Sequence, residues 1–226
     1  MIVLQNVTKR YGDVAAIDDL TVSIGRGEFS FLVGTNGAGK TTLLKLITRE
    51  ERPDHGVVLV NGVDVTKLKG DALTRLRRKL GVVFQDTRLL PNATVAENVG
   101  LPLQVRGRSR SEVRAAVADV LARVGLEGKA ERFPNQLSGG EQRKAAIGRA
   151  VIAGPEILLC DEPTDSLNPE RGREIIELLL DINADGVTTL VATHDREVVN
   201  HLRRRVIHMD EGRIRADAAV GVFDYA

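Results

Sequence analysis

The sequence is poor in cysteine, in excess charge of one sign and in long apolar runs, and each of these features would be typical of a particular class of protein. Its only cysteine is Cys160, so an internal disulfide is excluded, and a reducing compartment is expected. It has no excess charge of one sign, with 32 basic against 31 acidic residues among 226. Bulk nucleic-acid binding needs a basic face. We therefore expect no nucleic-acid partner.

Long apolar runs are the third feature in short supply. No run approaches the roughly 20 residues that a membrane-spanning helix needs. The segment 1–6 shows no charged leader followed by a long apolar stretch, so no signal peptide is expected. We expect no direct membrane span, and a protein partner would have to hold this chain at any membrane where it works. With 42% hydrophobic and 28% charged residues, the chain can build a packed α/β core.

What the chain does contain is an alternation of short strand patterns with helical patterns. Segments 2–7 and 15–24 predict early strands, and the second alternates apolar and polar residues like a half-buried antiparallel strand. The nearly all-apolar segments are typical of central parallel strands, and they stand at 29–33, 157–160 and 188–192. Further strands are predicted at 57–60 and 81–84, and a hairpin at 205–209 and 213–215.

The middle of the chain shows no strand pattern from about residue 89 to residue 136. Segment 109–125 predicts a helix with one apolar stripe, and Ser109 with Glu112 forms a capping box at its start. The arginine-rich segment 106–110 is predicted to be a solvated loop between two helices. We predict an α/β fold with a mostly parallel sheet, an N-terminal antiparallel β subdomain and an inserted α-helical subdomain at about 89–136, between core segments 1–88 and 137–226.

A phosphate-binding loop is predicted between the strand 29–33 and a helical pattern. The loop matches G-x-x-x-x-G-K-[ST], in which glycines let the backbone wrap closely around phosphates. Lys40 would reach the β- and γ-phosphates, and the hydroxyl of Thr41 would ligate Mg²⁺. The pattern therefore predicts a P-loop NTPase core. Its candidate nucleotide-binding residues are Gly34, Thr35, Asn36, Gly37, Ala38, Gly39, Lys40, Thr41 and Thr42.

Two acidic residues follow the apolar strand 157–160, at the sheet edge where α/β proteins bind ligands. Asp161 is predicted to hold Mg²⁺, and Glu162 to be the base that polarises the attacking water. Alone, the pair would more often be a solvated acidic turn, but the phosphate loop upstream favours the functional interpretation. His194 follows another apolar strand and is predicted to contact the γ-phosphate.

The motif LSGGEQ at 137–142 adds a second anion-binding helix start, which one chain does not need for one ATP. Paired with the phosphate loop, and followed by Asp161, Glu162 and His194, it resembles the ABC ATPase family. The resemblance implies one ABC ATP-binding domain over 1–226, ATP and Mg²⁺ as cofactors, and ATP hydrolysis. It also implies a head-to-tail homodimer in the ATP-bound state and an integral membrane partner that holds the chain at the cytoplasmic face of the membrane.

The resemblance further implies roles for single residues. Tyr11 would stack on adenine, and Gln85 would touch Mg²⁺ or the attacking water. Contacts to the ATP of the opposite subunit would come from Ser138, Gly139, Gly140 and Glu141. The D-loop would consist of Ser166, Leu167 and Asn168. The metal would be held by Thr41, Gln85 and Asp161.

Several positions depart from the family pattern. Asn168 replaces the usual aspartate of the D-loop, which puts the hydrolysis rate in doubt. Asp165 stands where a glycine is common, and Gly148 should cost its helix up to ~1 kcal/mol relative to alanine. Segments such as 83–91 look like the cell-division branch of the family.

Other functions stay open at this point. The chain could serve an exporter of the lipoprotein-release or macrolide type, or it could be a nucleotide-gated scaffold with weak hydrolysis. A soluble ABC protein of DNA repair or translation is disfavoured, because the predicted insertion is only about 50 residues long.

Overall fold

The computed structural model describes residues 1–223, so the last three residues of the predicted domain lie outside the described residues. The strands are β1 (Ile2–Tyr11), β2 (Val14–Ile24), β3 (Phe29–Val33), β4 (His55–Val60), β5 (Val63–Asp64), β6 (Leu80–Val83), β7 (Ile157–Asp161), β8 (Thr188–Thr193), β9 (Arg205–Asp210) and β10 (Arg213–Ala218). The α-helices are α1 (Lys40–Ile47), α2 (Gly70–Arg77), α3 (Val95–Val105), α4 (Arg110–Arg123), α5 (Gly139–Val151), α6 (Pro169–Ala184) and α7 (Arg196–Leu202). Short 3-10 segments are η1 (Val65–Lys67), η2 (Glu127–Lys129) and η3 (Pro134–Gln136).

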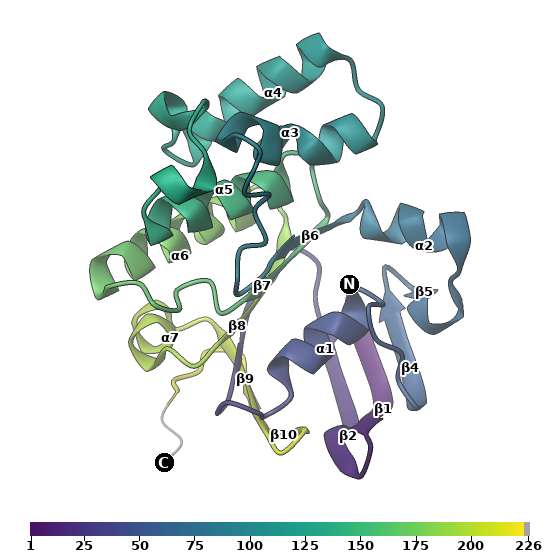
Figure 1. Ribbon diagram of the computed structural model, residues 1–226. Coiled ribbons are helices and arrows are strands. Elements are labelled where there is room, and N and C mark those ends of the chain that lie inside the picture. The colour runs from purple at the N-terminus through teal and green to yellow at the C-terminus, as the bar shows by residue number, and fades with distance from the viewer. Residues whose placement is uncertain (224–226) are drawn as a thin grey trace.

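The larger sheet has the order β10-β9-β3-β8-β7-β6, and only the edge strand β10 runs antiparallel to its neighbour. Strands β3, β7 and β8 are buried along their whole length. They are buried because α1 lies on one side of this sheet while α6 and α7 lie on the other (Figure 1). The mostly parallel sheet of the predicted α/β fold is therefore confirmed.

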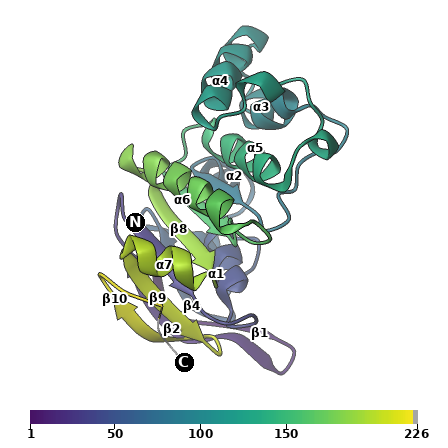
Figure 2. The ribbon, with the colours of Figure 1, turned by 90° about the vertical axis from the view of Figure 1, so that its left-hand side faces the viewer.

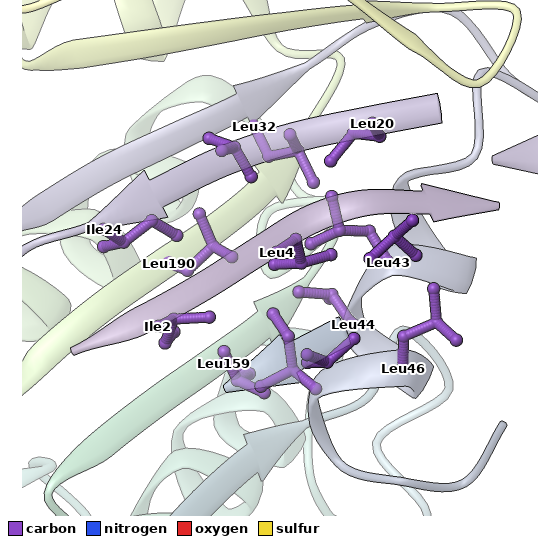
Figure 3. Packing of buried hydrophobic residues seen from close by; sticks show 14 of the residues in the cluster. Ile2, Leu4, Leu20, Ile24, Leu32, Leu43, Leu44, Leu46, Leu159 and Leu190 are labelled. Atoms are coloured by element: carbon purple, nitrogen blue, oxygen red, sulfur yellow. The ribbon is translucent and has the colours of Figure 1, made fainter. Parts of the chain in front are cut away.

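The second sheet is antiparallel, with the order β2-β1-β4-β5. Its apolar side chains pack against α1, which in turn packs against the parallel sheet. Figure 3 shows Leu4 of β1 beside Leu43 and Leu44 of α1, with Leu159 of β7 close by. Helix α1 thus packs between the two sheets. This packing holds the phosphate-binding loop before it in place.

A helical part made of α3 and α4 stands on α5, away from the antiparallel sheet (Figure 2). Capping boxes begin both helices, with Thr94 and Glu97 at α3 and the predicted pair Ser109 and Glu112 at α4. A Cβ atom added at Gly148 of α5 would lie only 3.1 Å from Val120 Cγ1 of α4. The glycine therefore allows these two helices to approach closely. None of the helices within residues 1–223 is long and apolar enough to cross a membrane.

Two local features differ from the sequence patterns. The prediction of a solvated loop at 106–110 is wrong for Arg106, whose guanidinium donates to the carbonyl oxygens of Ala153, at 2.7 Å, and of Arg78. Helix α2 was not predicted from the sequence, because its apolar face consists only of Ala72, Leu73 and Leu76 within eight residues.

Candidate active site

The phosphate loop, residues 34–39, leaves the buried strand β3 and runs directly into α1. Gly34 and Gly39 have φ values of 157° and 103°, and a Cβ at either would collide with a backbone oxygen, of Met209 or Ala16. Only glycine fits both positions. Within residues 1–223, no side chain caps the start of α1. The first backbone N–H groups of this helix can therefore face an anion.

The ammonium group of Lys40 lies against this loop and is almost fully buried. Its Nζ donates to the carbonyl oxygens of Gly34, at 2.8 Å, and Thr35, at 3.2 Å. The same Nζ lies 3.3 Å from Oε1 of Glu162. The structure thus brings the predicted phosphate-binding lysine and the predicted base into direct contact.

Glu162 is held on its other side by His194. The Nδ1 of His194 lies 2.9 Å from Glu162 Oε2, and the backbone N–H of His194 donates to the same oxygen at 3.2 Å. Glu162 has a φ of 48°, which bends the chain just after β7. The carboxylate is therefore fixed between a lysine and a histidine, beside the phosphate loop.

Asp161, the last residue of β7, lies beside the side chain of Thr41, and both line one cavity. Burial raises the pKa of Asp161, the hydrogen bond from Thr41 opposes this rise, and the charge of Glu162 adds to it. Its Oδ1 is buried and has no hydrogen-bond partner among residues 1–223. An unpaired buried carboxylate oxygen beside a threonine hydroxyl suits Mg²⁺, which binds through one or two protein oxygens plus phosphate oxygens.

Gln85 lies in the loop 84–88 that follows β6. It borders a cavity of about 380 Å³ that is also lined by Thr41 and Asp161. Its Nε2 donates to Oδ2 of Asp165 at 3.3 Å. The structure therefore places the three predicted metal ligands around one cavity.

Sequence reasoning missed the two arginines that hold this loop. Arg143 of α5 is buried and donates to the carbonyl oxygens of Phe84 and Gln85, and Arg149 donates to those of Thr87 and Arg88. The available signal was the unusual run 143–149, which the sequence alone could not connect to a distant loop.

Tyr11 ends β1 and stands 45% exposed beside α1. Burial raises the pKa of its phenol, while a hydrogen bond with Thr42 opposes this rise. The Lys9 ammonium lies 5.2 Å from the ring centroid. The predicted adenine-stacking ring is thus close to the predicted phosphate loop and keeps an open side.

The signature motif opens α5, where Ser138 and Glu141 form a capping box. Ser138, Gly140 and Glu141 line a separate hollow of about 240 Å³ that shares no lining residue with the cavity at Thr41. Within one chain, the signature hollow is therefore separate from the cavity at the predicted metal ligands. In the D-loop, Asn168 caps α6 by accepting a hydrogen bond from the N–H of Arg171 at 2.9 Å.

This fold and this arrangement of motifs define the nucleotide-binding ATPase subunits of ABC transporters. The family described as ABC transporter matches residues 17–165, and the chain belongs to this family. The chain is therefore an ATP-binding protein and an ATPase.

Individual relatives indicate which branch of the family this chain resembles. The chain is 46% identical to the cell division ATP-binding protein FtsE of Mycobacterium tuberculosis, over 99% of this chain and 98% of the relative. It is 42% identical to FtsE of Bacillus subtilis, over 99% of this chain and 98% of the relative. Among solved structures, it resembles a dimeric post-hydrolysis ATP-binding cassette bound to ADP and Pi. The TM-score is 0.89 at 36% identity, with coverage of 99% of this chain and 100% of the other.

Proposed function

We propose that this ATPase is an FtsE-like subunit that couples ATP-driven closure of a homodimer to an integral membrane partner of the FtsX type. It would act in cell division, at the cytoplasmic face of the membrane, and relay a signal that activates cell-wall hydrolases. Support comes from the FtsE-named relatives, which match nearly the whole chain at 42% and 46% identity. The dimeric cassette in a post-hydrolysis state supports the closure step.

The observation that carries the chemistry is the position of Glu162 between Lys40 and His194. Glu162 would take a proton from the attacking water, while His194 orients the carboxylate and contacts the γ-phosphate. Lys40 and the loop amides would bind the β- and γ-phosphates. Tyr11 would stack on the adenine.

The metal and the opposite subunit complete the proposed site. Thr41, Gln85 and Asp161 would hold Mg²⁺, which when bound offsets the negative charge of the phosphates. The signature residues would contact the ATP of the other subunit, beside the D-loop. This proposal assigns Ser138, Gly139, Gly140 and Glu141 to the signature, and Ser166, Leu167 and Asn168 to the D-loop.

The test of this site is Glu162→Gln, which keeps the shape of the side chain but removes the base. We expect ATP binding to persist, a stable dimer to accumulate with Mg-ATP, and phosphate release to fall by about 10²–10⁴-fold. Binding and dimer formation would be followed by equilibrium dialysis and light scattering. Glu177→Gln, at an exposed position on α6, is the matched control. Undiminished turnover in Glu162→Gln would refute Glu162 as the base.

The membrane partner would be identified by co-purification from membranes followed by mass spectrometry. An FtsX-like protein would support the proposal, whereas a lipoprotein-release or macrolide-type permease would replace it with an exporter. A scaffold with weak hydrolysis is the second candidate, since Asn168 lacks the charge of the usual aspartate. Phosphate release that is absent with the partner but restored by Asn168→Asp would favour the scaffold.

A further inference from the structure

The backbone of the loop 84–88 is held firmly by α5. Arg143, with 5% of its surface exposed, donates from Nη1 to the carbonyl oxygens of Phe84, at 2.9 Å, and Gln85, at 2.8 Å. Thr87 and Arg88 both have positive φ values, 55° and 47°. A loop that holds two non-glycine residues in this region needs such outside support. With the backbone fixed, the orientation of the Gln85 side chain becomes the remaining variable.

That orientation is decided by Asp165. A glutamine amide has an acceptor end and a donor end, and the two can exchange by a flip of the group. A carboxylate only accepts, so Asp165 Oδ2 selects the donor end, Nε2, at 3.3 Å. The carbonyl oxygen Oε1 of Gln85 is then the end that is free of Asp165. Oxygen, and not an amide nitrogen, is the ligand that Mg²⁺ accepts.

Asp165 is itself fixed by the turn that carries the acidic pair. Its backbone N–H donates to the carbonyl oxygen of Glu162 at 3.2 Å. It also faces the buried charge of Arg143. Burial lowers the pKa of the Arg143 guanidinium, and the negative charge of Asp165 opposes this change. Asp165 therefore connects the loop of Gln85, the signature helix and the turn after β7.

We propose that Asp165 is a positioning residue for hydrolysis, which turns the Gln85 amide so that its oxygen is presented to the metal. The inference rests on the proposed role of Gln85 as a Mg²⁺ ligand. Asp165 touches neither nucleotide nor metal in this arrangement. Its removal should therefore weaken the response to Mg²⁺ without weakening the binding of ATP itself.

The first experiment compares Asp165→Ala with the unaltered protein in a Mg²⁺ titration at saturating ATP. We expect the half-saturating Mg²⁺ concentration to rise about fivefold and kcat to fall, the loss expected for one hydrogen bond. The affinity for ATP in EDTA, measured by equilibrium dialysis, should stay unchanged. Asp181→Ala is the matched control, because Asp181 is an exposed carboxylate on α6 that pairs with Arg123. An unchanged Mg²⁺ dependence, or a raised kcat, in Asp165→Ala overturns the inference.

The second experiment is a double-mutant cycle. Gln85→Ala removes the amide that Asp165 orients, so it should itself raise the half-saturating Mg²⁺ concentration. In that background, Asp165→Ala should cause no further rise, because the side chain that it positions is gone. Independent effects of the two changes would overturn the inference and leave the proposed function standing. If the unaltered protein showed no Mg-dependent hydrolysis, both the inference about Asp165 and the proposed function would be contradicted.

Discussion

Asn168 shows how one side chain can keep a structural role while a chemical one is altered. Its oxygen accepts a hydrogen bond from the backbone N–H of Arg171, so it caps α6 as the more usual aspartate would. Asparagine and aspartate are about equally good at this position. The substitution therefore leaves the start of α6 intact, and any effect it has must come from the lost charge at the D-loop.

This leads to a prediction for stability. Asn168→Ala should lower the free energy of unfolding by about 1 kcal/mol, since it removes the cap, whereas Asn168→Asp should change it by only a few tenths of a kcal/mol. Urea denaturation followed by circular dichroism would measure both. If Asn168→Ala were as stable as the unaltered protein, the capping bond would not contribute to the native state.

The limits of sequence reasoning are clearest at this same scale. Lys40, Thr41 and Asp161 stand in local motifs, and each motif carries its own strand or helix context, so their meeting could be predicted. The contact between Gln85 and Asp165 joins positions 80 apart in the chain. The bonds from Arg143 reach residues 59 and 58 positions away. No periodicity or spacing encodes such contacts.

At the scale of elements, the strands of the parallel sheet were predictable because their burial on both faces leaves continuous apolar runs. Helix α4 was predictable from its apolar stripe and its capping box. Helix α2 was not, because its eight residues are too few for a helical period to repeat clearly, although Leu73 and Leu76 pack on the core. The penalty expected for Gly148 considers helix α5 alone. The structure shows that a side chain at this position would also contact α4.

Gly148 yields a prediction about the contact between α5 and α4. In an isolated helix, alanine would be favoured over glycine by up to ~1 kcal/mol. Here the new Cβ would press on Val120 Cγ1 at 3.1 Å and meet Val99 Cγ2 at 3.5 Å. We expect Gly148→Ala to be neutral or destabilising, because crowding offsets the gain in helix propensity.

The matched comparison is made in a Val120→Ala background, where the crowding atom is gone. There the same Gly148→Ala change should stabilise the protein by up to ~1 kcal/mol in urea denaturation. Equal effects of Gly148→Ala in both backgrounds would show that the helices shift freely and that Gly148 has no packing role.

At the scale of the whole molecule, the two hollows of the candidate site are the central fact. The cavity at Thr41 and Asp161 and the signature hollow lie in the same chain but share no lining residue. Helix starts lie at both motifs: α1 follows the phosphate loop without a side-chain cap among residues 1–223, and α5 opens at the signature with the cap of Ser138. In a head-to-tail homodimer, each phosphate loop would face the signature of the other subunit, so every complete site would contain parts of two chains.

A mixing experiment tests this division of the site. Lys40→Ala removes the phosphate-binding lysine of a chain but leaves its signature motif unchanged. Gly139→Asp leaves the phosphate loop unchanged but disables the signature, because its carboxylate would repel the triphosphate bound by the other subunit. It should not disturb folding, because an acidic residue is favoured in the first turn of a helix and a Cβ there meets nothing closer than 3.8 Å. Each variant alone should be inactive, while an equal mixture should recover about a quarter of normal phosphate release, from the mixed dimers that contain one intact site.

The control for this mixture is Lys40→Ala with Glu162→Gln. Both changes lie on the phosphate-loop side of the site, so a mixed dimer of these two chains contains no intact site and should stay inactive. Recovery in the first mixture alone would place the signature and the phosphate loop of each working site on different subunits. Equal inactivity in both mixtures would contradict a site shared between subunits, or would mean that the dimer works only with both of its sites intact. Size-exclusion chromatography with Mg-ATP, which reports whether the mixed dimers form, separates a failure of assembly from a failure of catalysis.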